Sequence, residues 1–196
     1  GANGTVSIVA DDLENGSSDN CSIVSRSVDI SSFSCDDLGA NTVSFTVTDA
    51  GGNTNSVTTS VTVEDSILPN AVTQNVTVAL DANGAASIIA DAIDQSTDNC
   101  TIASKSLDIM SFDCADLGAN TVMLTVTDQS GNSDTATAIV TVEDAIAPNV
   151  VTQNLAVQLN ASGDASVTAD AIDNGSTDNC SIASRSLDVS VFDCSN

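Results

Sequence analysis

The chain has 196 residues, of which 27 are acidic and three are basic, so its formal net charge is -24 at pH 7. Nucleic acid and anionic membranes would be repelled by this charge, and no apolar run approaches the roughly 18 residues that membrane insertion requires. The absence of histidine, tryptophan and tyrosine and of any recognisable nucleophile–base pair argues against an enzyme and against a sugar-stacking platform.

Residues 67–146 have the sequence of a series of strands. Thr and Val dominate, turn signals recur about every 8 to 12 residues, and no helical period is present. A turn is predicted at 81–84, a polar loop at 91–99 and a second turn at 128–132. The predicted strands, in chain order, are 75–80, 85–90, 102–107, 109–114, 121–127 and 136–142. This pattern favours an immunoglobulin-like β-sandwich.

The same sequence signatures return every 79 or 80 residues. Residues 96–108 recur as 17–29 and as 176–188, and residues 116–122 recur as 37–43. Self-similarity at a fixed period indicates stacked copies of one module. The predicted fold is therefore all-β, with tandem immunoglobulin-like β-sandwich modules of about 80 residues in an elongated array.

Three domains follow from this period. They are residues 1–66, a repeat lacking its first strand; 67–146, a complete repeat; and 147–196, a repeat truncated before its last strands. We expect the chain to be a window cut from a longer array. An incomplete sandwich would leave strand edges exposed, so we also expect neighbouring polypeptide or disorder at the C-terminal end.

Six cysteines occur in pairs spaced 14 residues apart: Cys21/Cys35, Cys100/Cys114 and Cys180/Cys194. The even number and the fixed spacing predict one local disulfide in each repeat and an oxidising compartment. Closing such a loop contributes about 3 kcal/mol. Buried free thiols and a zinc site are the alternatives, and zinc is disfavoured because each repeat offers one isolated pair and the chain has no histidine.

Two further positions recur in every repeat. A phenylalanine precedes the second cysteine and is predicted to lie in the core, and a basic residue is predicted to form an ion pair with a nearby Asp, worth about 0–1 kcal/mol if exposed. The residues are Phe33, Phe112 and Phe192, and Arg26, Lys105 and Arg185.

Strand directions bring acidic residues from three separate segments to one end of each repeat. The incoming linker, the loop after the second strand and the turn before the last strand should all lie at the pole where the chain enters. Clustered carboxylates repel one another, and Ca²⁺ takes six to eight oxygen ligands. The sequence therefore predicts a Ca²⁺ site at the junctions between repeats. The alternative is a set of solvated loop acids, because Asp and Asn also favour turns.

The candidate Ca²⁺ ligands fall into three groups. Those of the middle repeat are Glu64, Asp65, Asp91, Asp94, Asp98, Asn99, Asp128 and Asn132. Those of the following junction are Glu143, Asp144, Asp170, Asp173, Asp178 and Asn179. The first repeat has no incoming linker and keeps Asp11, Asp12, Glu14, Asp19, Asn20, Asp49 and Asn53, so its site is expected to be incomplete.

Two strings resemble a known family. Thr-Val-Thr-Asp-x-x-Gly-Asn at 125–132 and Val-Thr-Val-Glu-Asp-x-x-x-Pro at 140–148 are similar to hyalin-repeat and related Ig-like modules. Such modules occur in long secreted bacterial adhesins, including gliding-motility and surface adhesins of Bacteroidota. The resemblance covers the whole chain and implies a tandem, cell-surface or fibrous β-sandwich array that often binds calcium between modules.

These observations predict a structural repeat region of an extracellular adhesin or surface filament, stapled by disulfides and stiffened by Ca²⁺. Its partners would be neighbouring repeats of the same chain or filament. A host or surface ligand would be bound through regions outside this chain, and neither nucleic acid nor membrane insertion is expected. The alternatives are a glycan- or protein-binding module and an accessory domain of a secreted enzyme. The nearly constant loop string Ser-Thr-Asp-Asn-Cys argues against a binding module, whose loops should vary.

Overall fold

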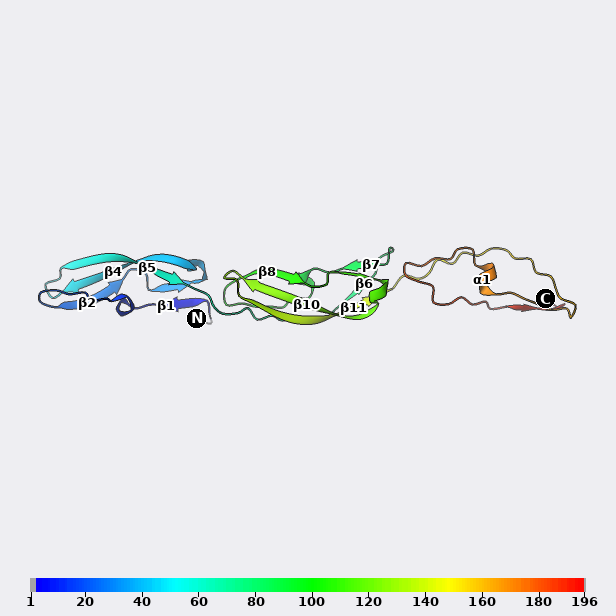
Figure 1. Cartoon of the computed structure of the whole chain (residues 1–196), viewed down its shortest axis with the longest axis horizontal. Coiled ribbons are helices and arrows are strands. Elements are labelled where there is room, and N and C mark those ends of the chain that lie inside the picture. Colours follow the sequence, from blue (N-terminus) through cyan, green and yellow to red (C-terminus); the bar gives the residue numbers. More distant parts are fainter. Residues whose placement is uncertain (1–2, 196) are drawn as a thin grey trace. The chain divides into compact units, whose positions relative to one another are not determined.

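The computed structural model describes residues 3–195, and these residues are almost entirely β (Figure 1). One short helix, α1 (Ala169–Ile172), and four 3₁₀ turns interrupt the strands: η1 (Ala10–Leu13), η2 (Cys35–Asp37), η3 (Ala90–Ala92) and η4 (Cys114–Asp116). The strands are β1 (Thr5–Ser7), β2 (Ile23–Val28), β3 (Ser32–Ser34), β4 (Gly39–Asp49), β5 (Thr54–Val63), β6 (Val76–Ala79), β7 (Ala85–Ser87), β8 (Ile102–Leu107), β9 (Ser111–Asp113), β10 (Gly118–Asp128), β11 (Ser133–Glu143), β12 (Ala165–Ser166) and β13 (Val191–Phe192).

The middle repeat contains a four-stranded sheet in the order β6-β11-β10-β8 and a two-stranded sheet, β7-β9. β10 runs antiparallel to β8, with Leu124 opposite Leu107, and β6 runs parallel to β11, with Val76 opposite Val140. The first repeat has the equivalent sheets β2-β4-β5 and β1-β3, and the third repeat has the pair β12-β13. The predicted all-β, immunoglobulin-like sandwich class is confirmed.

The alternating apolar positions of the long strands form the core. Val122, Leu124 and Val126 of β10 and Val140 of β11 are fully buried, because successive residues of a strand point to opposite faces of the sheet. Among the repeated phenylalanines, Phe33 and Phe112 are buried, as predicted, and Phe192 is half-buried.

Contacts divide the chain into two compact units, and each unit combines parts of two repeats. Within the described residues, unit 1 comprises 3–73, 94–107 and 123–137, and unit 2 comprises 74–93, 108–122 and 138–195. The repeats are defined by sequence and the units by contacts. The boundaries 1–66, 67–146 and 147–196 therefore stay a prediction.

The disulfides join consecutive repeats. The second cysteine of one repeat bonds to the first cysteine of the next, as Cys35–Cys100 and as Cys114–Cys180, with Cα atoms 5.5 and 5.4 Å apart. Cys21 and Cys194 are free and exposed. The predicted pairs Cys21/Cys35, Cys100/Cys114 and Cys180/Cys194 are therefore wrong.

The strand pairing explains this correction. The two strands between Cys100 and Cys114, β8 and β9, do not pair with each other as a hairpin. Instead β8 pairs with β10 and β9 pairs with β7. Each observed disulfide lies within one compact unit, Cys35–Cys100 in unit 1 and Cys114–Cys180 in unit 2.

Between residues 3 and 195, the structure contains no helix of the length and apolar character needed to cross a membrane.

Candidate metal centre

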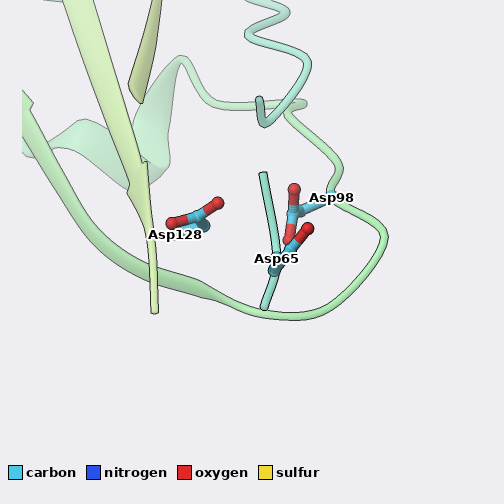
Figure 2. Close-up of side chains that lie close together, drawn as sticks. All are labelled: Asp65, Asp98 and Asp128. Carbon is cyan, nitrogen blue, oxygen red and sulfur yellow. The ribbon is translucent and has the colours of Figure 1, made fainter. Parts of the chain in front are cut away.

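Three aspartates from separate segments of unit 1 converge at the start of the middle repeat. Asp65 lies in the linker after β5, Asp98 in the loop before β8 and Asp128 at the end of β10. Each offers one carboxylate oxygen, and these oxygens lie within 4.8 Å of one another. Figure 2 shows Asp65 and Asp98 close together, with Asp128 facing them.

Asp128 is held by the turn that follows it. It is 3% exposed and accepts hydrogen bonds from the backbone N–H of Asn132 at 2.8 Å and from Asn132 Nδ2 at 2.7 Å. Burial raises the pKa of Asp128, but the hydrogen bonds from Asn132 and from the turn amides outweigh it, and the net pKa lies below its ordinary value. The group is therefore a fixed carboxylate anion at neutral pH.

Hydrogen bonds and a disulfide fix the loop that carries Asp98. Asp98 Oδ2 accepts a hydrogen bond from the Cys100 backbone N–H at 2.9 Å, which is the local turn that Asp favours. Asn99 Nδ2 donates to Asp65 Oδ1 at 3.2 Å. Cys100 is bonded to Cys35, so the disulfide and the acidic group share one loop.

Buried oxygens without hydrogen-bond partners lie in this group. They are Asp65 Oδ2, Asp98 Oδ1 and Asn99 Oδ1. Leaving a buried acceptor unpaired costs about 1–3 kcal/mol, and more for a charged group. Three such acceptors on residues that contact one another form the oxygen donor set that a hard cation such as Ca²⁺ prefers.

The other predicted ligands of the middle repeat have different surroundings. Glu64 is exposed and lies outside the three-acid group, because neighbouring residues of an extended linker point to opposite sides. Asp91 is exposed on η3. Asp94 is paired with Lys105 at 2.7 Å. Asn132 contributes its amide nitrogen, rather than the predicted oxygen, to Asp128 and to the Asp65 carbonyl.

The following junction, in unit 2, repeats part of this arrangement. Asp178 Oδ1 and Asn179 Oδ1 are again buried without a partner, and Cys180 N–H donates to Asp178 Oδ2 at 3.3 Å. Asp144 is half-buried and Glu143 is exposed. Asp170 and Asp173 instead face Arg185, at 3.9 and 3.4 Å.

The first repeat shows less convergence. Asp11, Asp19 and Asn20 are exposed. Asp49 accepts two hydrogen bonds from Asn53, one from its backbone N–H and one from its side-chain amide, both 2.8 Å long. Asp128 accepts the same two bonds from Asn132. Within residues 3–195, only Asp65, Asp98 and Asp128 form a group of three acids close enough to share one ion.

The repeated basic residues form ion pairs. Lys105 bonds Asp94 and Arg185 bonds Asp173, as predicted. In the first repeat the partner is a glutamate, because the position equivalent to Asp94 is Asn15 and Arg26 bonds the adjacent Glu14 at 2.8 Å. Burial raises the pKa of Asp94, but the hydrogen bonds from Lys105 and Ser96 lower it by more. The pKa of Asp94 therefore lies below its ordinary value.

A glycine accommodates each junction, and its role could not be read from the sequence pattern. Gly84 has φ of 72°, and a Cβ there would lie 2.7 Å from the Asn179 carbonyl oxygen and 2.7 Å from Cys114 Sγ. Gly4 lies in the same way against Asn99 and Cys35. Both glycines follow an asparagine. Asn83 and Gly84 belong to the turn predicted at 81–84, which the structure contains, but the sequence pattern did not indicate that this turn contacts the next repeat.

No family model and no curated protein matches the chain. Similar solved structures include a protocadherin gammaB7 EC3–6 cis-dimer, with 18% identity, TM-score 0.33 and coverage of 60% of this chain and 37% of that one. Others are PcdhgB3 EC1–4, with 14% identity, TM-score 0.35 and coverage of 77% and 47%, and protocadherin gamma B7 extracellular cadherin domains 1–4, with 16% identity, TM-score 0.31 and coverage of 82% and 51%. The chain spans about half or less of the length of these structures.

Proposed function

We propose that this chain is a non-enzymatic structural repeat region of an extracellular adhesin or surface filament, in which Ca²⁺ binds at the junction between the first and second repeats. The supporting observation is the approach of the Asp65, Asp98 and Asp128 carboxylate oxygens to within 4.8 Å of one another. Asn99 Oδ1, which is buried and unpartnered, is the fourth candidate ligand.

The chemistry of the donor set favours Ca²⁺ over other ions. All four donors are oxygens, which excludes the thiolate and imidazole ligands typical of zinc. The donors come from three segments in an irregular arrangement. Ca²⁺ tolerates flexible geometry with six to eight oxygens, whereas Mg²⁺ demands a near-ideal octahedron.

Ca²⁺ at this position would neutralise carboxylates that otherwise repel one another and would tie the linker at Asp65 to two loops of the next repeat. Because the ion would bind the folded junction only, it would stabilise that junction by linkage. The Cys35–Cys100 bond connects the same two repeats covalently. Ion and disulfide together would stiffen the connection, which is the property a stalk or filament needs.

The remaining parts of the proposal concern surroundings and partners. Disulfides persist in oxidising compartments, which supports an extracellular, cell-surface or secreted location. Neighbouring repeats are the proposed partners, and recognition of a host or surface ligand is assigned to regions outside this chain.

Calorimetric titration of the full chain with Ca²⁺ tests the proposal. Extracellular Ca²⁺ sites bind at about 10⁻⁴–10⁻³ M, so the titration should extend to about 10 mM. We expect Asp128→Asn and Asp98→Asn each to weaken binding about tenfold or more. Glu64→Gln, which removes an exposed charge next to Asp65, should leave affinity within about twofold. The magnitudes assume about 1.4 kcal/mol per lost charged ligand.

Two checks complete this experiment. Each variant is first compared with the parent by thermal unfolding in EDTA, so that a folding defect is separated from lost binding. Small-angle scattering with and without Ca²⁺ then tests the stiffening. Absence of binding heat at 10 mM, or equal weakening by Glu64→Gln and Asp128→Asn, would contradict the proposed site.

A further inference from the structure

We propose that the Cys35–Cys100 disulfide and the Ca²⁺ site of the first junction are thermodynamically coupled. Reduction of this disulfide weakens Ca²⁺ binding, and bound Ca²⁺ makes the disulfide harder to reduce. The inference rests on the Ca²⁺ site proposed above and adds a means of regulating that site. Its starting point is the loop Asp98-Asn99-Cys100, in which two candidate ligands with unpartnered buried oxygens directly precede a cysteine of the disulfide.

Asn99 contacts both sulfur atoms of the disulfide. Its side-chain Nδ2 lies 3.4 Å from Cys100 Sγ and donates to Asp65 Oδ1 at 3.2 Å. Its backbone carbonyl oxygen lies 3.6 Å from Cys35 Sγ. The Cys100 backbone N–H donates to Asp98 Oδ2 at 2.9 Å. A displacement of either sulfur therefore acts on Asn99 and Asp98 through direct contacts.

The disulfide fixes this loop to the first repeat. Cys35 begins η2, and its Sγ lies 3.5 Å from the Gly4 carbonyl oxygen. The two cysteines and the three-acid group all belong to unit 1. The covalent bond thus closes the same compact unit in which the carboxylates meet, and it holds their positions before any ion binds.

Repulsion within the three-acid group is the physical reason for the coupling. Asp65, Asp98 and Asp128 offer carboxylate oxygens within 4.8 Å of one another, and like charges at this separation repel. In the oxidised chain the disulfide holds the Asp98 loop in place against this repulsion. In the reduced chain the loop can move away from Asp65, so Ca²⁺ binding has to order it again and the affinity falls. Such coupling is reciprocal, so Ca²⁺ opposes reduction by the same factor.

The Cys114–Cys180 disulfide supplies an internal reference. All four bonded cysteines are half-buried, so the two disulfides are similarly shielded from solvent. At the second junction Asn179 Nδ2 donates to the backbone carbonyl of Asp81 at 3.2 Å instead of to a linker carboxylate. Among residues 3–195 there is no second group of three acids close enough to share an ion. Ca²⁺ should therefore protect the disulfide of the first junction selectively.

Reduction proceeds by thiol–disulfide exchange with a small thiol such as glutathione. One glutathione thiolate attacks a protein sulfur and releases the other cysteine, and a second glutathione thiolate then attacks the mixed disulfide. The protein disulfide gains two electrons and two protons to become two thiols, and two glutathiones become one glutathione disulfide. Because either the bond or the ion opposes separation, the first junction loosens most where thiols are present and Ca²⁺ is scarce.

A redox titration of the full chain tests the coupling. The Cys21→Ser/Cys194→Ser variant is the background, so that only the four bonded cysteines report. It is equilibrated in glutathione buffers with CaCl₂, with MgCl₂ as an ionic-strength control or with EDTA, and alkylation with peptide mass spectrometry measures the reduced fraction of each disulfide. Half-reduction is expressed as the ratio of reduced glutathione, squared, to glutathione disulfide. At about 10 mM metal, we expect Ca²⁺ to raise this ratio at least about fivefold over Mg²⁺ at the first junction and to leave it within about twofold at the second.

Variants of this background separate the ion from the disulfide. Asp128→Asn removes a candidate ligand that lies outside the loop carrying Cys100, and it should abolish the protection by Ca²⁺. Glu64→Gln, the matched control, should retain it. Cys35→Ser/Cys100→Ser should bind Ca²⁺ more weakly in calorimetry by the same factor as the protection. If circular dichroism shows that this last variant does not fold, the redox titrations of the background and of Asp128→Asn decide the question.

The outcomes separate this inference from the proposed function. The coupling would be overturned by equal protection of both disulfides, by full protection in Asp128→Asn, or by Ca²⁺ binding heat in the oxidised chain with no shift in half-reduction. The last of these results would leave the Ca²⁺ site intact. Absence of binding heat would instead remove the Ca²⁺ site and the coupling with it.

Discussion

The loop Asp98-Asn99-Cys100 performs a separate task with each of its residues. Asp98 holds the turn through one carboxylate oxygen and leaves the other buried without a partner. Asn99 bonds Asp65 with its side chain, and its carbonyl lies 3.6 Å from Cys35 Sγ. Cys100 carries the disulfide. The near-constancy of this string along the chain thus has a structural explanation, because each of the three residues takes part in the contact between the first and second repeats.

Substitution of Gly84 should show how tightly the contact between consecutive repeats is packed around it. Gly84→Ala forces a Cβ into a positive φ and against the Asn179 carbonyl and Cys114 Sγ, and we expect a loss of about 2–4 kcal/mol. Gly118→Ala is the matched control, because Gly118 has φ of 103° with nothing within 4 Å of the added Cβ, and it should cost about 1–2 kcal/mol. Urea unfolding of the oxidised chain measures both losses. Equal losses would show that backbone conformation alone decides the effect.

At the scale of elements, the strands could be predicted because their residues alternate. β8 (Ile102–Leu107) matches its prediction at both ends, and β6 lies within the predicted 75–80. β10 begins at Gly118, three residues before the predicted start. Those three residues have no apolar alternation, and Asn120 is held by side-chain bonds to the carbonyls of Asp116 and Gly118, which a period-2 pattern does not reveal.

The candidate site could be predicted only in part. Strand direction correctly grouped Asp65, Asp98 and Asp128, because it determines at which end of a sandwich a loop lies. It does not determine where a side chain points, so Glu64 and Asp94 were included although one is exposed and the other bonds Lys105. The disulfide partners are 65 and 66 residues apart, and a local spacing of 14 residues carries no information about such distant pairing.

The ion pair that fastens the Asp94 loop to β8 gives a pH-dependent prediction. Asp94 is 8% and Lys105 31% exposed, and the pKa of Asp94 is lowered in the folded chain. The pair therefore contributes stability above the unfolded pKa, about 4, and loses it as the pH falls through the lowered folded pKa. Lys105→Met should destabilise the chain by about 1–3 kcal/mol at pH 7 and by progressively less below pH 4.

Urea unfolding at several pH values measures this difference, with Arg26→Met as the matched control. Glu14, the partner of Arg26, is more exposed than Asp94. Because water screens exposed ion pairs, Arg26→Met should lower the stability of the chain by less than Lys105→Met. A pH-independent effect of Lys105→Met would mean that the lysine acts through packing of its aliphatic chain instead of through Asp94.

At the scale of the whole molecule, both disulfides join consecutive repeats, and each lies in a different compact unit. Unit 1 holds the Cys35–Cys100 bond and the three-acid group, and unit 2 holds the Cys114–Cys180 bond. Bonds that close loops of 65 and 66 residues remove about 4 kcal/mol of unfolded-state entropy each, compared with about 3 kcal/mol for the local loops predicted from sequence. The cross-repeat pairing therefore stabilises the chain more and also prevents adjacent repeats from separating.

If each compact unit also unfolds as one cooperative unit, removing one disulfide should loosen all segments of its own unit. These segments come from two different repeats. Cys35→Ser/Cys100→Ser should accelerate amide hydrogen exchange in residues 3–73, 94–107 and 123–137, which form unit 1, and leave residues 138–195 unchanged. Cys114→Ser/Cys180→Ser is the matched control and should produce the complementary pattern. Exchange measured by mass spectrometry would distinguish this from the alternative, in which the whole middle repeat, 67–146, loosens together because it folds as one sandwich. Unit-wise loosening would mean that tension on the array is resisted first by the junctions, where the disulfides and the acidic group are located.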